Sequence, residues 1–378
     1  MPPERASRVQ PGGRVAHRND GIGEEGELFA THIGGSALPE GVMMRGKLSW
    51  AAAVREPSGR IYVEEHELPA PDSRPAWQRL PIVRGCVSFV ESMLLSYKAM
   101  CVASDHAYDD EGETYASLLA AGRVSPVAAA GETRAVAEDG GVPAGGGDGV
   151  PVSSPEPMSP VAFGLSMALG LLLGIALFMA IPVAVANLLV GDYAPTNAIA
   201  WNLVEAVLRI AIFVAYIWAI GLMPDMRRLF GYHGAEHLTI HCFEHGLELT
   251  PANAARFSRL HVRCGTAFLI MTMIVAILVN TLVPVASWAE ALGLAGVGRA
   301  AFVLASRLVL LPLVAGVSYE VTVKRAGSHP DLWLVRLVLW PGLQMQRLTT
   351  RVPDEGMLEC AIAAMERVRA TELAAGLE

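Results

Sequence analysis

The feature that most constrains the fold of this chain is a stretch between Glu156 and Asp192 that contains no charged residue. Its centre, residues 161–190, consists almost entirely of aliphatic, aromatic and small side chains. An α-helix of about 20 apolar residues is long enough to cross the hydrocarbon core of a bilayer. Residues 161–190 are therefore predicted to span a membrane. The composition agrees, because 52% hydrophobic and 17% charged residues are unusual for a soluble protein of 378 residues.

Three further apolar stretches are predicted to span the membrane, at residues 201–223, 266–286 and 300–323. The predicted fold is therefore a mainly α-helical polytopic membrane protein with about four transmembrane helices and a small cytoplasmic β-containing N-terminal domain. The second and fourth spans contain ionisable residues that must face protein or water, because charge in lipid is costly. These residues are Glu205, Arg209 and Arg307.

The distribution of arginines predicts the orientation in the membrane. The loop of residues 224–265 contains five arginines, whereas residues 191–200 contain no Lys or Arg and residues 287–299 contain one. By the positive-inside rule, the 224–265 loop and both termini are expected in the cytoplasm. The first 27 residues lack the apolar core of a secretion signal, so no signal peptide is expected.

The remaining segments are predicted to lie outside the bilayer. Residues 51–55 and 60–64 flank a turn at Pro57-Ser58-Gly59 and are predicted to pair as a β-hairpin. An amphipathic helix at residues 81–104 is expected either to pack on the β-rich unit or to lie on the membrane surface. Residues 331–343 are too short to cross and too apolar for water, which indicates an interfacial piece. The expected organisation is a disordered N-terminus at 1–27, a β-rich unit with its helix at 28–120, a disordered linker at 121–160, a membrane domain at 161–345 and a cytoplasmic tail at 346–378.

Charge and cysteine usage exclude two classes of function. The net charge is −8 and no basic run is interleaved with aromatic residues, so nucleic-acid binding is not expected. The five cysteines are odd in number and form no C-x-x-C pair, which is unlike the disulfide framework of a secreted domain. The thiols are expected to be reduced. The lipid bilayer is the one partner that the sequence itself predicts.

The sequence GYHGAEH in the 224–265 loop contains the pattern H-x-x-E-H, formed by His233, Glu236 and His237. On a helix, histidines at i and i+4 lie one turn apart on the same face, so both imidazoles can reach one metal ion. Glu236 would project beside that ion, where a carboxylate can accept a proton as a general base. The alternative is that the histidines only pack or cap at the membrane surface.

A zinc site of this kind needs a third protein ligand. Glu244 and His241 lie further along the same helix face, and an unbroken helix would hold either residue far from the same ion. Glu320 lies about one turn inside the cytoplasmic end of the last span, where an ionisable residue indicates a functional site or a salt bridge with an arginine of the 224–265 loop. The candidate ligands from other segments are His261, Cys264 and Glu320.

The order of these motifs resembles that of the YqhQ-like family of bacterial membrane proteins, which have unknown function and are labelled predicted metal-dependent enzymes. The resemblance rests on GGSALPEGVMMRG (34–46), GYHGAEH (231–237), HVRCGT (261–266), LLPLVAGVSYE (310–320) and QRLTTRVPD (346–354). It implies a multi-pass protein of the bacterial inner membrane. It also implies functional roles for His233, Glu236, His237, Glu244, His261, Cys264 and Glu320, while His241 and His245 fall outside the expected pattern.

The first and last of these motifs contain candidate substrate-binding residues. Glu40 and Arg45 lie in a glycine-rich turn that either serves the backbone conformation or closes over the site. Arg347 and Arg351 follow the interfacial segment, where they either reach anionic head groups or bind substrate.

The sequence thus predicts a metal-dependent membrane hydrolase, with a divalent metal ion, zinc preferred, at the cytoplasmic membrane surface. Its substrate would be a membrane peptide or a lipid-linked molecule. Two alternatives remain open, a non-enzymatic scaffold with a structural metal or polar site, and an ion-coupled transporter that uses Glu205, Arg209, Arg307 and Glu320. The oligomeric state is not predicted.

Overall fold

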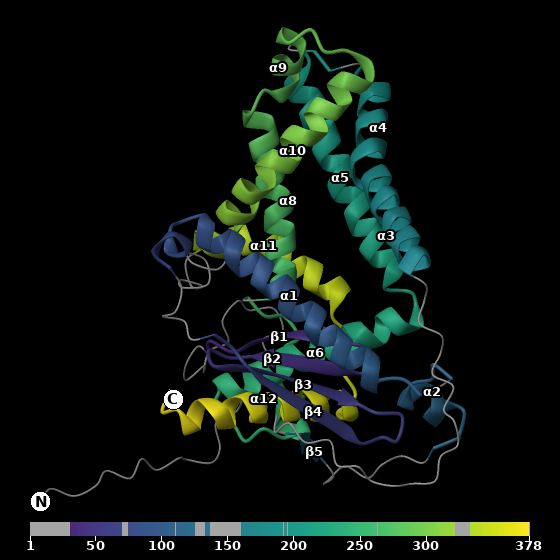
Figure 1. Cartoon of the computed structure of the whole chain (residues 1–378), viewed down its shortest axis with the longest axis vertical. Helices are drawn as coiled ribbons and strands as arrows, with labels where there is room; N and C mark the ends of the chain where they lie inside the picture. Colours follow the sequence, from purple (N-terminus) through teal and green to yellow (C-terminus); the bar gives the residue numbers. More distant parts are fainter. Residues whose placement is uncertain are drawn as a thin grey trace, which may run out of the picture.

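The computed structural model has two parts, a bundle of long apolar helices and a body built around a small β-sheet (Figure 1). The predicted disordered N-terminus and most of the predicted linker lie outside the described residues. The structure describes residues 31–69, 75–109, 111–124, 133–136, 160–191, 193–194, 196–262, 264–321 and 333–377.

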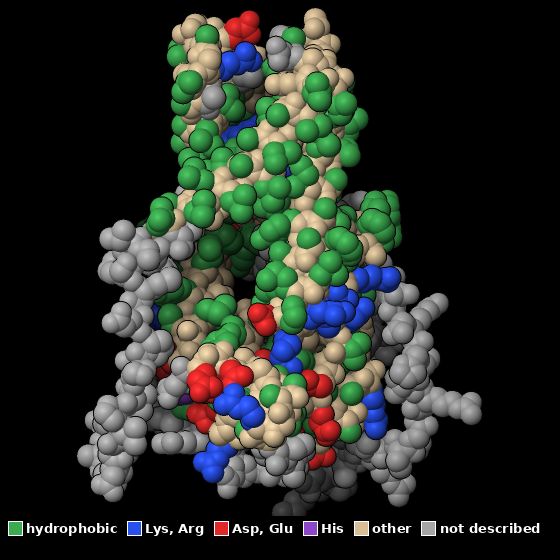
Figure 2. All heavy atoms as spheres, turned by 90° about the vertical axis from the view of Figure 1, so that its right-hand side faces the viewer, with side chains coloured by type: hydrophobic (Ala, Val, Ile, Leu, Met, Phe, Trp, Pro, Cys, Tyr) green, Lys and Arg blue, Asp and Glu red, His purple; other side chains and the backbone are tan. Residues whose placement is uncertain are grey.

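Four described helices are long and apolar enough to cross a membrane by length and composition, which indicates a membrane protein. Three of them lie at the predicted spans, Ala168–Val190, Ile199–Ile220 and Gly296–Tyr319. On the face drawn in Figure 2, hydrophobic side chains cover most of the bundle, and most of the acidic and basic side chains lie on the body below it. The bundle comprises α3 (Pro160–Ile175), η3 (Ala176–Ala180), α4 (Ile181–Val190), α5 (Ala198–Ile220), α8 (Gly265–Leu282), α9 (Val285–Ala291) and α10 (Gly296–Tyr319).

The fourth of these helices differs from the prediction, because it is α1 (Val83–His106) and not the stretch at 266–286. That stretch forms α8, which has no charged residue and packs against α10 through Met271, Val275 and Val314. One face of α1 is buried against the β-sheet, so α1 cannot be surrounded by lipid. Its apolar composition therefore reflects a helix that lies between the sheet and the bundle, as Figure 1 shows.

The sheet is an antiparallel meander of four strands, β1 (Gly34–Leu38), β2 (Gly41–Arg45), β3 (Ser49–Arg55) and β4 (Ile61–Glu67). The predicted hairpin around residues 57–59 is confirmed, with Arg55 opposite Ile61. A fifth strand, β5 (Thr133–Val136), pairs in parallel with β4. These four residues lie in the stretch predicted to be a disordered linker, and for them the prediction is wrong.

Helices cover both faces of the sheet because strand side chains alternate between the two faces. Val42, Met44 and Ala51 point into a core formed with α6 (Pro224–Glu244) and α12 (Glu355–Ala374). Met43, Trp50 and Ala52 point to the opposite face, where they pack against α1. The region predicted as a C-terminal tail thus contains a core helix, with Met357, Ala361, Ala364, Met365 and Val368 buried at helical spacing.

The predicted interfacial segment forms part of α11 (Trp333–Thr349), which lies with α1 between the bundle and the sheet (Figure 1). The side chains of Trp333, Leu337 and Trp340 are 73%, 61% and 58% exposed. Their spacing of four and three residues places them on one face of the helix. Exposed tryptophans on an apolar helix face are typical of residues that sit at the level of lipid head groups.

A buried ion pair connects the β-sheet to the start of α6. Glu40, at the turn between β1 and β2, is 4% exposed and accepts two hydrogen bonds from Arg228, at 2.6 and 2.7 Å. The Tyr232 hydroxyl donates to the same carboxylate at 3.3 Å. Glu40 therefore holds α6 against the sheet, and its predicted contact with substrate stays a prediction.

Replacing Glu40 with Gln is expected to lower the free energy of unfolding by about 2 kcal/mol, because the partly buried Arg228 guanidinium would lose its counter-charge. Thermal denaturation in detergent measures this loss. The added change Arg228→Met should recover part of it, whereas a Glu40→Gln protein with unchanged stability would contradict a structural role.

Candidate metal centre

Helix α6 carries the H-x-x-E-H motif in the interior of the protein. Every residue from Phe230 to Glu244 is buried except His233, which is partly buried. Only glycine fits at position 234 of the HGAEH sequence, because a Cβ on Gly234 would lie 2.1 Å from the carbonyl oxygen of Arg351. The Arg351 amide donates to the carbonyl of Phe230 at 2.7 Å, so the chain after α11 lies directly on α6 at this point.

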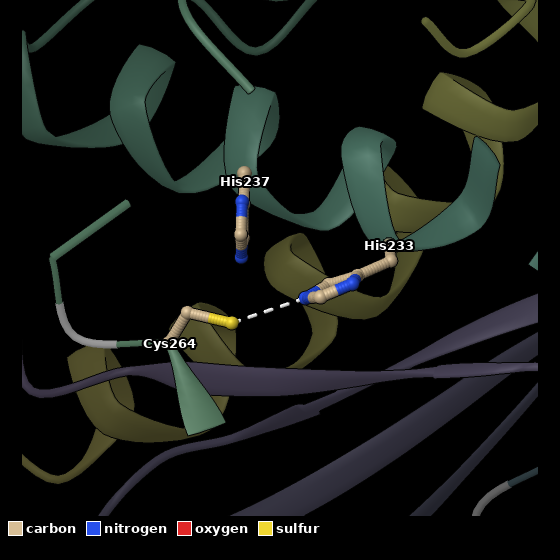
Figure 3. A group of neighbouring side chains, drawn as sticks. All are labelled: His233, His237 and Cys264. Carbon is tan, nitrogen blue, oxygen red and sulfur yellow. Dashed lines mark hydrogen bonds between the residues drawn. The ribbon is translucent and has the colours of Figure 1, made fainter. Parts of the chain in front are cut away.

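His233 and His237 point from α6 toward Cys264, which lies just before α8 (Figure 3). The distance between Nε2 of His233 and Sγ of Cys264 is 3.1 Å. One ligand atom from each of the three residues lies within 4.8 Å of the others. Two imidazoles and a thiol at this separation are a ligand set that binds zinc in proteins.

The backbone fixes the orientation of both imidazoles. Nδ1 of His233 is 2.8 Å from the carbonyl oxygen of Thr349, and Nδ1 of His237 contacts the carbonyl oxygen of Arg259. Since carbonyl oxygens accept, each Nδ1 carries a proton, and Nε2 is the ring atom of each histidine that is left to bind a metal ion. Nε2 of His237 is buried and makes no hydrogen bond within the described part of the chain. Metal-binding histidines are typically held in this manner.

The electrostatics of the cluster favour a thiolate at Cys264. Burial opposes ionisation, but the charges of His233 and His237 and the hydrogen bond with His233 hold the pKa of Cys264 well below its usual value. For His233, burial acts to lower the pKa, and the thiolate together with Glu236 outweighs burial and raises the pKa to about 9. The metal-free site is thus a thiolate–imidazolium pair, and the thiolate is the form that binds metal.

A pH titration of the metal-free protein tests this ion pair. The pair is expected to stabilise the fold only between the low pKa of Cys264 and the His233 pKa of about 9. The thiolate is protonated as pH falls through the first value, and the imidazolium loses its proton as pH rises through the second. At pH 7, the ultraviolet thiolate absorbance of the wild type should exceed that of Cys264→Ser by about one thiolate.

The other two buried thiols serve as an internal reference for this titration, because burial raises the pKa of Cys242 to about 11 and that of Cys360 to about 12. Both therefore stay protonated at neutral pH. Equal absorbance of the wild type and Cys264→Ser at pH 7 would show that Cys264 is not ionised.

Glu236 lies beside the cluster and beneath strand β1. It is 5% exposed and its carboxylate accepts a hydrogen bond from the amide of Gly35. A Cβ on Gly35 would lie 2.8 Å from Cγ of Glu236, so a larger residue there would displace the carboxylate. Burial raises the pKa of Glu236, and the charges of His237 and His233 offset part of this rise. A raised pKa suits a general base that works near neutral pH.

A second group of ligating side chains lies one turn further along α6. It contains His241 and Glu244 from α6 and His261 from the loop before α8, and all three are buried. Their ligand atoms also lie within 4.8 Å of one another. The structure thus divides the predicted ligands, because Glu244 and His261 lie in this second group and not with His233.

Glu320 is not in either group of potential metal ligands among the described residues. Its carboxylate pairs with Arg84 of α1, with Nε to Oε1 at 2.7 Å and Nη2 to Oε2 at 2.5 Å. Glu320 therefore does not lie with the histidines, contrary to the prediction. A salt bridge was the alternative, and its partner comes from α1 and not from the 224–265 loop.

The remaining predicted residues lie around the site in different settings. Arg45, at the end of β2, contacts Ser92 at 3.3 Å and Glu91 at 3.8 Å, both on α1. Arg351 is partly buried and its Nε atom makes no hydrogen bond to any described residue. Arg347 is exposed in the last turn of α11. Burial, then the charges of Arg351 and Arg347, lower the pKa of Arg259, so the three guanidinium groups are near one another.

Sequence reasoning missed two residues of this region. The sequence argument ranks His241 low as a ligand because an unbroken helix holds it far from the ion of His233, although its spacing from Glu244 places both on one face of α6. Arg259 enters the sequence argument only as one of the five arginines that predict the orientation of the 224–265 loop. In the structure its carbonyl holds His237 and its side chain contacts the carbonyl of Thr350 at 3.5 Å. No sequence pattern predicts that a loop carbonyl will orient a histidine.

Comparison with known proteins gives relatives without a described activity. A family model described as "Protein of unknown function (DUF1385)" matches residues 80–371. The chain is 28% identical over 342 residues to "Uncharacterized protein YqhQ" of Bacillus subtilis (strain 168), and the match covers 89% of this chain and 91% of that protein. No solved structure matches the chain. The resemblance predicted from the motifs is confirmed.

Proposed function

The chain belongs to the DUF1385 family of proteins of unknown function, and from the geometry of its site we propose that it is a metal-dependent hydrolase that acts at the membrane surface. The observation that carries this proposal is the cluster of His233, His237 and Cys264, with Glu236 directly beside it. Three protein ligands leave one coordination position open, as in catalytic zinc sites. Bound zinc would supply Lewis-acid chemistry at this point.

The residues of this chain fit the demands of such a site. The thiolate of Cys264 and Nε2 of His237 supply ligands, and Nε2 of His233 supplies the third when the imidazolium releases its proton on metal binding. Glu236 is held by the Gly35 amide and accepts the proton of the attacking water molecule as general base. Because the site is buried between α6, β1 and the loop before α8, it excludes bulk water from the reacting groups.

The surroundings of the site favour a substrate with an anionic group in the membrane. Arg347 lies on the same face of α11 as Trp333 and Trp340, at multiples of seven residues, so it shares the face proposed to contact lipid. Arg259 and Arg351 lie next to it, and Arg259 also carries the carbonyl that orients His237. Arginine recognises phosphate and carboxylate with paired hydrogen bonds. We therefore propose a lipid-linked anionic substrate, with a phosphate-bearing lipid preferred over a membrane peptide.

The double change Arg259→Gln, Arg351→Gln is expected to weaken the binding of phosphatidic acid about tenfold or more, because two guanidinium groups beside the anion are lost. Native mass spectrometry of the protein in nanodiscs that contain phosphatidic acid or phosphatidylcholine measures retained lipid. Arg60→Gln, in the exposed turn between β3 and β4, is the matched control and should bind like the wild type. Equal retention of both lipids by the wild type would contradict the anion preference.

The experiment that tests the proposed function is an assay of water-dependent cleavage in nanodiscs. The protein is stripped with a chelator, reloaded with zinc, and offered phosphate-bearing lipids and membrane peptides in H₂¹⁸O. The expected result is product with one ¹⁸O atom, formed only by the reloaded protein. Product formation by the stripped protein would contradict metal-dependent hydrolysis.

A second candidate function follows from the 3.1 Å contact between His233 and Cys264, which is also the geometry of a cysteine nucleophile and its base. Cys264 is only 9% exposed, which favours a ligand over a nucleophile. The two functions respond differently to the assay above. A nucleophilic cysteine would work without metal and would be inactivated by iodoacetamide.

A further inference from the structure

The potential ligands on α6 extend too far along the helix to serve one metal ion. His233, His237, His241 and Glu244 follow one another at spacings of four, four and three residues on a single face. From the first to the last, an α-helix rises by roughly 16 Å. A single ion can therefore bind residues of only one part of this face.

The loop before α8 provides a partner for each half of the face. Cys264 lies with His233 and His237, and His261, three residues earlier, lies with His241 and Glu244. The loop thus runs antiparallel to α6, and each residue of the loop completes one pair from the helix. The rings of His261 and His241 are 4.9 Å apart between centroids, and those of His261 and His237 are 5.5 Å apart. The two groups are neighbours and share no ligand.

The second group is buried more completely than the first. His241, Glu244 and His261 are 5%, 0% and 3% exposed. Oε1 of Glu244 accepts the amide of Thr31 at 2.8 Å, and Oε2 lies 3.7 Å from Nε2 of His261. A carboxylate removed from water in this way requires a cation or several hydrogen bonds nearby. A metal ion meets this requirement and also explains why two imidazoles face the carboxylate.

The tautomer of His241 is consistent with metal binding. Its Nε2 atom is 2.9 Å from the carbonyl oxygen of Leu260, so Nε2 carries the proton and Nδ1 has the lone pair. As with His233 and His237, a backbone carbonyl fixes the ring by accepting the distal N–H. A further carbonyl of the same loop thus performs the same task in the second group.

We propose that His241, Glu244 and His261 form a second divalent-metal site, next to the site of His233, His237 and Cys264. Two histidines and one glutamate are a ligand set of catalytic zinc sites, and they also suit other first-row transition metals. The second site contains no thiol, which makes it spectroscopically distinct from the first. This proposal does not depend on the proposed hydrolase activity, because it concerns binding alone.

Cobalt(II) substitution of the full-length protein in detergent tests the proposal. Cobalt bound to a thiolate gives a sulfur-to-metal charge-transfer band in the near ultraviolet, whereas cobalt bound to His and Glu gives only visible d–d bands. The wild type is expected to bind about two equivalents. Glu244→Gln should bind about one equivalent of cobalt and keep the charge-transfer band. In Cys264→Ser, the cobalt ion that binds most tightly should give no charge-transfer band.

The remaining outcomes each decide the proposal. A wild type that binds one equivalent, with the charge-transfer band and unchanged by Glu244→Gln, would overturn the second site and leave the first. One equivalent without the band, lost in Glu244→Gln, would support the second site and contradict the first. His241→Gln provides an independent variant of the same site. Circular dichroism and gel filtration select the variants that are folded.

Discussion

Replacing Glu236 with Gln is expected to reduce turnover by about 10²- to 10⁴-fold, which is the usual contribution of a general base. Gln has nearly the same shape as Glu, and its amide oxygen can still accept the hydrogen bond from the Gly35 amide. It cannot accept a proton. Metal binding by His233, His237 and Cys264 should therefore stay unchanged while cleavage is lost.

Two measurements on the same preparation check this expectation, the rate of ¹⁸O incorporation into product and the metal content. Asp225→Asn is a suitable control, because this exposed carboxylate lies in the first turn of α6, away from the cluster. Normal turnover by Glu236→Gln would remove Glu236 as the base. Loss of metal in Glu236→Gln would instead identify Glu236 as a fourth ligand and favour a closed, structural site.

Replacing Cys264 with Ser is expected to lower the zinc affinity of the first site by about 100-fold or more, because a neutral hydroxyl replaces a thiolate ligand. Even the loss of a group that only orients a ligand typically costs 10- to 100-fold. Competition with a fluorescent zinc chelator measures the change. The affinity should depend on pH in the wild type, falling as Cys264 is protonated in acid.

The exposed Cys101 on α1 offers a matched control for this substitution. Cys101→Ser removes one thiol and leaves every residue of the cluster in place, so its zinc affinity should equal that of the wild type. A Cys264→Ser protein with unchanged affinity at both sites would show that the thiol of Cys264 is not a ligand.

Segments from both ends of the chain hold the residues of the site in place. The carbonyl of Thr349, at the end of α11, orients His233, and Gly35 of β1 holds Glu236. Both α11 and α1 lie between the bundle and the sheet (Figure 1). The cluster is thus assembled directly beneath the proposed membrane surface, where a lipid-linked substrate could reach it without leaving the bilayer.

Features encoded by local patterns were predictable from the sequence. Long apolar stretches predicted three of the helices that are long enough to cross a membrane, and the turn at residues 57–59 between two short runs predicted the hairpin of β3 and β4. The i, i+4 spacing placed His233 and His237 on one face of a helix, as the structure shows. Each of these inferences depends only on residues that are near one another in the chain.

Features that depend on distant partners were not predictable. The helical pattern of α12 indicates an apolar face, but it does not say that the face packs on a sheet formed some 300 residues earlier. The partner of Glu320 could not be predicted for the same reason, because Arg84 is 236 residues away in the chain. His241 ranks low as a ligand of the same ion as His233, and a helix pattern alone does not reveal that the loop returns with His261.

The measurement that tests the central proposal most directly is the metal content of the protein purified in detergent without chelator, determined by elemental mass spectrometry. The double variant His233→Ala, His237→Ala is analysed beside the wild type. A divalent ion in the wild type, with about one equivalent per chain lost in the variant, is the predicted result. The absence of metal from both proteins, also after incubation with zinc, would contradict a metal centre at His233, His237 and Cys264.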